Sequence, residues 1–324
     1  MDHKQDIIDI LEKLRKKEQA DKEVWKARAY AVVIKELKAK EGPVITIEDV
    51  KGLKGVGEKI LVKIEEIIET GKLKQVQQYD QKYDLMNELM KIHGIGNVKA
   101  KELVEVHGIQ SIEELETKQE LLNDKQKMGL KYWKDFVLRI PRKEMEKHEA
   151  FIKSSIHKIN PELISEIVGS YRRGAKDSGD IDVLITHPNR EIEDEELKNI
   201  VKYMEKEKYC VDTFALGNKK YLGVCKIKYG RHFRRLDLLI TKKHEFPFAI
   251  LYFTGDFQFN IEMRNICLEQ GLTLSEYGLK YVKGPKKGQF VEQEFETEQD
   301  IFKFLGLKYV KPSDRKSKAL EKIN

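Results

Sequence analysis

The segment GSYRRGAKDSGDIDVLIT, residues 169–186 of the 324-residue chain, decides the fold. Its last part is rich in aliphatic residues and free of breakers, so it predicts a β-strand. Asp180 and Asp182 are two positions apart, and alternate side chains of a strand share one face. Carboxylates so placed repel each other unless a cation lies between them, and Mg²⁺ accepts such oxygen ligands beside water and phosphate. The strand therefore predicts a divalent-metal site.

The first part of the same segment supplies groups that bind phosphate. Gly169 permits close approach of a backbone, and Ser170 offers a hydroxyl and an amide. Arg172 and Arg173 offer guanidinium donors suited to phosphate oxygens. An Asp-x-Asp triplet or an arginine pair alone would be incidental. The alternative interpretation of the segment is a surface loop followed by a solvated strand edge. The ordered combination favours a nucleotide site.

A third carboxylate, Asp237, lies in HFRRLDLLIT, residues 232–241, where it alternates with aliphatic residues as in a strand. Residues 219–243 contain nine Lys or Arg and Asp237 as the only acid. The alternative is an exposed aspartate on an edge strand. We favour a metal ligand, because two-metal phosphoryl or nucleotidyl transfer needs a further carboxylate beside the attacking hydroxyl.

Composition predicts a globular protein of two or more domains. The chain is 40% hydrophobic and 36% charged, and its net charge of +6 points only weakly to a polyanionic partner. No apolar run is long enough to span a membrane and no signal-peptide core is present, so we expect an intracellular protein. Cys210, Cys225 and Cys267 are widely spaced, which predicts neither a disulfide nor a zinc site.

The N-terminal third predicts helices joined by a repeated glycine turn. Apolar positions at helical spacing over residues 7–40 indicate two amphipathic helices, and capping boxes at 46–49 and 111–114 open further ones. Gly55-Val-Gly57 and Gly94-Ile-Gly96 each precede a lysine-bearing helix. Such turns expose amide groups that suit a single phosphate, which positions a nucleic-acid backbone without reading its sequence. Glycine used only for its conformation is the alternative.

Helical patterning continues to about residue 137, where Pro141 is expected to end it. Strands are then expected near 164–169, 180–186, 222–228 and 236–241, alternating with helices, one of them at 260–269. The polar tail, residues 311–324, is expected to be loose.

These residues together resemble the family X DNA polymerases, over nearly the whole chain to about residue 311. The motifs follow family order: GVGEKI (55–60), GIG (94–96), RIPR (139–142), GSYRRGA (169–175), GDIDVLITHP (179–188), RRLDLLI (234–240), LYFTGD (251–256) and LSEY (274–277). The resemblance implies an α+β fold: an all-helical DNA-binding region with two helix-hairpin-helix motifs, a nucleotidyltransferase-type palm with a mixed sheet, and a small α+β C-terminal subdomain. The implied domains are 1–78 (deoxyribose-phosphate lyase), 79–138 (DNA-binding), 139–243 (palm) and 244–324 (nucleotide selection).

The resemblance also implies a role for each matching residue. Asp180, Asp182 and Asp237 would bind two Mg²⁺ ions, or Mn²⁺ in their place. The implied nucleotide-binding residues are Arg139, Ser170, Arg173, Gly179, Tyr252, Phe253, Gly255, Phe257 and Asn260. The implied DNA-binding residues are Gly55, Gly57, Gly94, Gly96, Lys220, Arg235, Arg264 and Tyr277. A monovalent cation, Na⁺ or K⁺, is implied at each hairpin turn, at Lys51, Leu53 and Val56 and at Met90, Ile92 and Ile95.

In the N-terminal region, Lys63 matches the family's lysine that forms a Schiff base with a 5′-deoxyribose phosphate. Lys26 and Lys59 would surround it with positive charge, and Tyr30 would line the pocket. The residue pattern alone favours an ordinary solvated lysine.

Three residues depart from the family pattern. Gln75 replaces a lysine of the lyase pocket, and Leu239 replaces an arginine that can pair with the second aspartate of the Asp-x-Asp triplet in the open form. Phe257 replaces an aspartate near the incoming base, where its ring could stack or instead turn inward beside Phe253 and Phe259.

The expected function is template-directed repair synthesis on gapped or nicked DNA from deoxynucleoside triphosphates, with a lyase activity. The alternatives are an untemplated nucleotidyltransferase and a non-catalytic DNA-binding module. We expect a monomer with repair proteins as partners and no membrane association. It would act in the nucleus if cellular, and in the cytoplasm or virion if viral.

Overall fold

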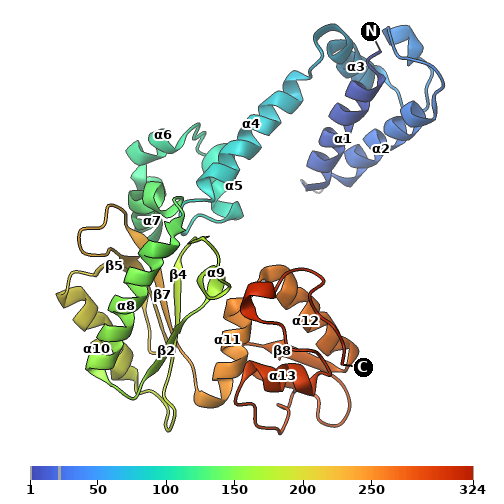
Figure 1. The fold of residues 1–324 in the computed structure, drawn as a ribbon. Coiled ribbons are helices and arrows are strands. Elements are labelled where there is room, and N and C mark those ends of the chain that lie inside the picture. Colours follow the sequence, from blue (N-terminus) through green and yellow to red (C-terminus); the bar gives the residue numbers. More distant parts are fainter. Residues whose placement is uncertain (1, 21–22, 324) are drawn as a thin grey trace. The chain divides into compact units, whose positions relative to one another are not determined.

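The computed structural model describes residues 2–20 and 23–323 and divides into two compact units, Met1–Asn123 and Asp124–Asn324 (Figure 1). Each unit has a hydrophobic core of its own. Within the described ranges, no helix is both long and apolar enough to cross a membrane.

The first unit is built from helices. They are α1 (Lys4–Ala20), α2 (Val24–Ala39), α3 (Glu58–Thr70), α4 (Lys74–Leu89), α5 (Asn97–Glu105) and α6 (Ile112–Thr117), with 3₁₀ turns at Ile47–Asp49 and Gln119–Leu121. Ile7 and Leu11 of α1 are fully buried against Val33 and Leu37 of α2, which confirms the predicted amphipathic pair.

The two glycine turns have nearly the same backbone geometry. Gly57 caps α3 at φ −95° and ψ 176°, and Gly96 caps α5 at φ −94° and ψ 179°. Gly55 and Gly94 precede them at φ +85° and φ +89°, in the left-handed region that glycine enters without steric cost. The predicted repeat is therefore a repeat in structure, with amide groups exposed at two helix N-termini.

The second unit is α+β. Its elements are α7 (Asp124–Phe136), β1 (Ile140–Pro141), α8 (Arg142–Ile159), β2 (Ile164–Ile167), α9 (Gly169–Arg172), β3 (Asp177–Ser178), β4 (Ile181–Thr186), α10 (Asp194–Lys206), β5 (Cys210–Leu216), β6 (Lys220–Cys225), β7 (Arg234–Ile240), α11 (Phe246–Thr254), α12 (Phe257–Glu269), β8 (Leu272–Ser275), β9 (Gly278–Tyr281) and α13 (Glu298–Phe304). Five strands form a mixed sheet in the order β2-β4-β7-β6-β5, in which only β4 and β7 are parallel.

The two faces of this sheet are covered by different elements. Ile181 and Val183 of β4 belong to the core formed with α8 and α10, whereas Leu184 packs with Ala249 of α11. Because side chains alternate along a strand, Asp182 lies on the face of Leu184. Figure 1 shows the C-terminal subdomain, α11 to α13, beside the palm sheet.

The expected break near Pro141 is present, because α7 ends at Phe136 and Ile140–Pro141 forms β1. Pro141 is also the N-cap of the 18-residue helix α8. Two other features of this unit differ from expectation. Strand β5 was not predicted. Asp212 and Thr213 interrupt its apolar pattern, and two register shifts bend its pairing with β6. The tail is not loose through residue 323, since Arg315 is buried and the Ile323 amide donates to the Gly306 carbonyl at 2.8 Å.

Candidate active site

The parallel pairing of β4 and β7 places Asp182 directly opposite Asp237. Both carboxylates lie at the centre of the sheet, so the edge-strand alternative for Asp237 is wrong. Gly169 begins α9 beside them at φ +65°, and a Cβ added there would lie 3.4 Å from Asp182 Oδ2. Glycine at this position therefore keeps backbone and carboxylate close together.

The site has an excess of negative charge. Burial, followed by the charges of Asp180 and Asp237, raises the pKa of Asp182 to about 7. Burial also raises the pKa of Asp237, although the charges of Arg235 and Lys220 act in the opposite direction. A bound cation would relieve this repulsion, and carboxylate oxygens are the ligands that Mg²⁺ prefers. The residues present therefore fit a divalent ion.

The first aspartate of the triplet is held by an arginine. Asp180 Oδ2 accepts a hydrogen bond from Arg235 Nη2 at 2.6 Å. Within residues 2–20 and 23–323, no three His, Cys, Asp or Glu side chains form a ready-made metal site. Leu239, which replaces a pairing arginine, packs with apolar residues between β4 and α11. Arg235 therefore occupies one oxygen of the Asp180 carboxylate in this structure.

The predicted phosphate-binding side chains surround the loop before β4. The Ser170 hydroxyl donates to Ser178 Oγ at 3.0 Å, and Arg139 Nε donates to Asp177 Oδ1 at 2.8 Å. Arg139 Nη1 lies 3.0 Å from the place of a Cβ on Gly179, so this glycine gives the guanidinium room. Arg173 donates to the Thr254 carbonyl, and burial lowers the pKa of its guanidinium. These four residues come together around one loop.

The predicted nucleotide-selection residues lie where α11 meets α12. Asn260 Nδ2 donates to the Tyr252 carbonyl at 2.8 Å, and the Arg264 guanidinium lies 5.1 Å from the centre of the Tyr252 ring. Phe253 contacts Tyr252 edge to face, and Gly255 lies between the two helices at φ +69°. Tyr277 is exposed at the turn between β8 and β9. The arrangement gathers Tyr252, Phe253, Gly255 and Asn260, with Arg264 beside them.

Phe257 does not turn into the core. Its side chain is 80% exposed, whereas Phe259, two residues later, is fully buried in the C-terminal core. The alternative in which Phe257 joins Phe253 and Phe259 is therefore wrong. A large apolar ring held in solvent at the start of α12 is available for stacking.

A buried ionic triad was missed from the sequence. Glu298, at the start of α13, accepts hydrogen bonds from both terminal nitrogens of Arg172, at 3.1 and 2.7 Å, and from Arg315 Nη1 at 2.7 Å. Arg172 also donates to Thr254 Oγ1 at 2.8 Å. The triad joins α9, which carries Ser170, to the C-terminal subdomain. No local signal could have found it, because its partners are far apart in the sequence.

A second buried network fixes the start of β7. Arg234 donates to both carboxylate oxygens of Glu144, at 2.7 and 3.1 Å, and to the Leu138 carbonyl. Burial alone would raise the pKa of Glu144, but hydrogen bonds from His148 and Arg234 outweigh it and lower that pKa to about 2. The network therefore holds the first residue of β7, the strand that carries Asp237, in place.

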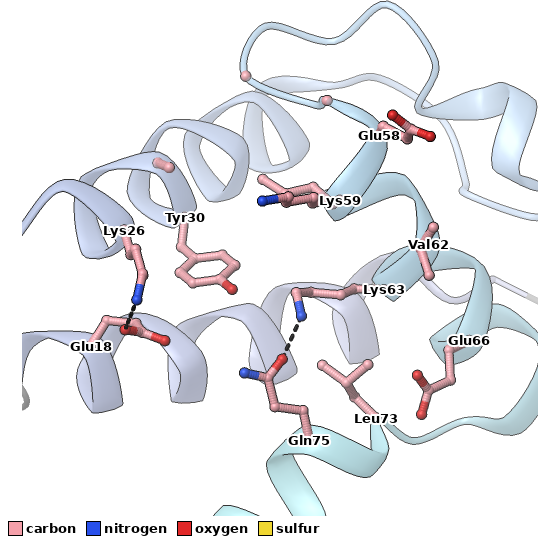
Figure 2. Close-up of a pocket in the computed structure, with 14 residues that line it drawn as sticks. Glu18, Lys26, Tyr30, Glu58, Lys59, Val62, Lys63, Glu66, Leu73 and Gln75 are labelled. Atoms are coloured by element: carbon pink, nitrogen blue, oxygen red, sulfur yellow. Dashed lines mark hydrogen bonds and ion pairs between the residues drawn. The ribbon is translucent and has the colours of Figure 1, made fainter. Parts of the chain in front are cut away.

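The N-terminal unit contains a cavity of about 820 Å³ that gathers the predicted lyase residues (Figure 2). Lys63 Nζ donates to Gln75 Oε1, and Lys26 Nζ lies 4.0 Å from the buried carboxylate of Glu18. Figure 2 shows the Tyr30 ring between Lys26 and Lys63, with the Lys59 side chain above it. The four predicted lyase residues share one cavity, and Glu18 is an addition that the sequence did not suggest.

The residues predicted to hold a monovalent cation lie at the two turns. The Val56 amide donates to the Leu53 carbonyl at 3.1 Å, and the Ile95 amide donates to the Ile92 carbonyl at 3.0 Å. Lys51 and Met90 immediately precede these turns. The cation itself stays a prediction. The three cysteines are free and buried, as expected.

The mixed sheet, its facing aspartates and the glycine-serine turn define a palm of the nucleotidyltransferase type. Four family models match the chain: helix-hairpin-helix domain over residues 2–73, fingers domain of DNA polymerase lambda over 87–137, DNA polymerase beta palm over 139–243 and DNA polymerase beta thumb over 249–316. DNA polymerase lambda of Rattus norvegicus is 32% identical over 320 residues, which is 95% of this chain and 56% of the relative.

Two further relatives match at lower identity. DNA polymerase lambda of Arabidopsis thaliana is 26% identical over 83% of this chain and 54% of its own length. DNA nucleotidylexotransferase of Xenopus laevis is 28% identical over 84% of this chain and 60% of its own length. The chain thus spans a little over half the length of these relatives. It belongs to the family X DNA polymerases.

Proposed function

We propose that the protein is a template-directed DNA repair polymerase that fills short gaps and also removes a 5′-deoxyribose phosphate. The pairing of Asp182 with Asp237 in adjacent strands carries the polymerase proposal, because nucleotidyl transfer needs carboxylates gathered on a rigid frame. The family and the helix-hairpin-helix repeat support DNA as the substrate. Its partners would be gapped DNA, deoxynucleoside triphosphates and repair proteins.

In this proposal each residue of the palm has a defined task. Asp180, Asp182 and Asp237 would hold two Mg²⁺ ions, or Mn²⁺ in their place, and Asp237 would accept the proton of the primer 3′-hydroxyl. When bound, divalent ions polarise the phosphate oxygens and favour ionisation of the attacking hydroxyl. Arg139, Ser170, Arg173 and the Gly179 amide would bind the triphosphate. Breaking the Asp180–Arg235 ion pair would be part of assembling the site.

Extension of a primer across a one-nucleotide gap tests this proposal. Asp237→Ala and Asp182→Asn should each lower nucleotide addition by orders of magnitude, because each removes a ligand for a doubly charged ion. Both variants should bind gapped DNA as the wild type does. Asp124→Asn is a matched control, since that carboxylate is fully exposed at the start of α7. Near-normal gap filling by the Asp237→Ala variant would refute the metal assignment.

The same assay separates templated from untemplated transfer. Similarity to a DNA nucleotidylexotransferase keeps the untemplated activity as the second candidate. A templated enzyme should add the complementary nucleotide and should add little to a single-stranded primer. Equal extension with and without template would favour the second candidate.

The proposed lyase activity rests on the cavity around Lys63. The amine of Lys63 would attack the sugar aldehyde at C1′ with loss of water, giving a Schiff base, and removal of a C2′ proton would then expel the 3′-phosphate. Borohydride should trap wild-type protein on a 5′-deoxyribose-phosphate substrate and should trap Lys63→Ala far less. Lys72→Ala, an exposed lysine nearby, is the control. Undiminished trapping of Lys63→Ala would show that another lysine forms the Schiff base, with Lys59 and Lys26 the first candidates.

We further propose that Phe257 stacks on the incoming base. Stacking is worth about 1 to 3 kcal/mol per base and is nearly indifferent to sequence. Phe257→Ala and Phe257→Asp should therefore raise the KM for nucleotide while the melting temperature stays unchanged. A lower melting temperature with an unchanged KM would contradict this role.

A further inference from the structure

The turn between β6 and β7 carries charge and an aromatic ring that the proposed chemistry does not use. Its sequence, KIKYGRHF over residues 226–233, contains Lys226, Lys228 and Arg231 and no acidic residue. Residues 226–232 are called the basic turn below. They belong to the stretch 219–243, where nine Lys or Arg accompany a single aspartate.

The basic turn presents Tyr229 at a conformational cost. The Gly230 amide donates to the Ile227 carbonyl at 2.8 Å, which closes a four-residue turn, and Tyr229 is its third residue at φ +61°. The left-handed region costs a residue with a side chain about 1 to 2 kcal/mol. Burial of the ring does not offset this cost, because the Tyr229 side chain is 93% exposed. An exposed aromatic ring in a strained position points to a function.

The base of the basic turn is fixed while its tip is free. Asp135 of α7 bonds both the His232 ring at 2.7 Å and the Phe233 amide at 3.0 Å. The Phe233 ring packs against Tyr132, with 4.9 Å between their centres. The tip is therefore displayed from a rigid support, which limits the entropy lost when it binds a partner.

Lys226, Lys228 and Arg231 of the basic turn have no carboxylate partners in the described parts of the chain. Other basic residues of the stretch are neutralised: Arg234 by Glu144, and Arg235 by Asp180. Lys228 lies 5.3 Å from the centre of the Tyr229 ring, and Lys226 lies 4.7 Å from that of Phe233. Uncompensated positive charge beside an exposed ring favours a nucleic-acid strand, whose phosphates meet the cations while a sugar or base meets the ring.

The basic turn lies at the same end of the sheet as the catalytic carboxylates, because β4 and β7 are parallel and both begin there. Tyr229 and Arg235 are six positions apart, so the extended chain between them spans at most about 22 Å. That distance corresponds to about six base pairs of duplex DNA. On the basis of the proposed function, we propose that the basic turn binds the DNA strand that ends at the active site, with Lys228 and Arg231 on phosphates and Tyr229 against a nucleotide.

Equilibrium binding of fluorescein-labelled gapped DNA, measured by anisotropy against salt concentration without Mg²⁺ or nucleotide, tests the proposal. Lys228→Gln with Arg231→Gln should lower the slope of log affinity against log salt by about two, since each phosphate contact contributes about 0.9. Lys202→Gln with Lys206→Gln removes the same charge from exposed positions of α10 and should leave the slope unchanged. An unchanged slope in the turn variant, or an equal loss in both, overturns the proposal.

Tyr229→Gly separates binding from folding. Glycine suits the left-handed position, so this variant should melt no lower than wild type, yet its affinity for gapped DNA should fall about 5- to 150-fold. Tyr229→Phe keeps the ring and should bind nearly as wild type does. Unchanged affinity of Tyr229→Gly, or a lower melting temperature, overturns the role of the ring. A wild-type protein that binds through the basic turn but extends no primer would refute the proposed polymerase function alone.

Discussion

Removal of the Glu298 carboxylate should destabilise the second unit more than any change on its surface. Glu298 is 4% exposed and receives three hydrogen bonds from Arg172 and Arg315, whose side chains are 18% and 0% exposed. Glu298→Ala leaves the Arg315 charge buried without a counter-ion among the rings of Phe259 and Phe302. Loss of one partner of a buried pair costs about 3 to 5 kcal/mol. For a unit of this size that lowers the melting temperature by about 6 to 20 °C.

Differential scanning calorimetry with urea titration measures this cost. Glu296→Ala, an exposed carboxylate two residues earlier, should shift stability by less than about 0.5 kcal/mol. Arg315→Met added to Glu298→Ala should recover part of the loss, because it removes the stranded charge and keeps apolar volume. A loss below about 1 kcal/mol for Glu298→Ala, or no recovery in the double variant, would refute the reasoning.

Three further outcomes are expected. Gly223→Ala should lower stability by about 1 to 3 kcal/mol in urea titration, since its Cβ would lie 2.0 Å from the buried Tyr221 hydroxyl; unchanged stability would contradict the packing. Because the folded pKa of Glu144 lies below its ordinary value, its contribution to the free energy of unfolding is full above about pH 4.5 and is lost as pH falls toward 2. In an acid titration, Glu144→Gln should therefore lose less stability than wild type over that range. In EDTA, Asp182→Asn should melt a few degrees higher than wild type, because it relieves repulsion among carboxylates; excess Mg²⁺ should reduce the difference.

The features that could be predicted from the sequence are those that depend on residues close together in the chain. The spacing of Asp180 and Asp182 predicted that the two carboxylates are neighbours, and the charge of Asp180 does raise the pKa of Asp182, although β4 begins one residue after Asp180. The paired glycine turns were visible as a repeat. The ionic triad was not predictable, because Arg172 and Glu298 are separated by 126 positions and neither has a distinctive local pattern. Strand β5 was missed for a different reason, since its bulges break the alternation on which strand prediction depends. The sequence likewise could not show which arginine pairs with Asp180, because that depends on the three-dimensional positions of Arg234 and Arg235.

The register between β4 and β7 has a consequence for evolution within such a protein. Main-chain hydrogen bonds at the middle of a five-stranded sheet set the separation of Asp182 and Asp237, and no side chain of the C-terminal subdomain takes part in that pairing. Substitutions on α12, such as the phenylalanine at position 257, can therefore accumulate without disturbing the spacing of these two carboxylates. The pairing of the carboxylates and the surface of the C-terminal subdomain are set by separate parts of the fold, so a lineage can change one and keep the other.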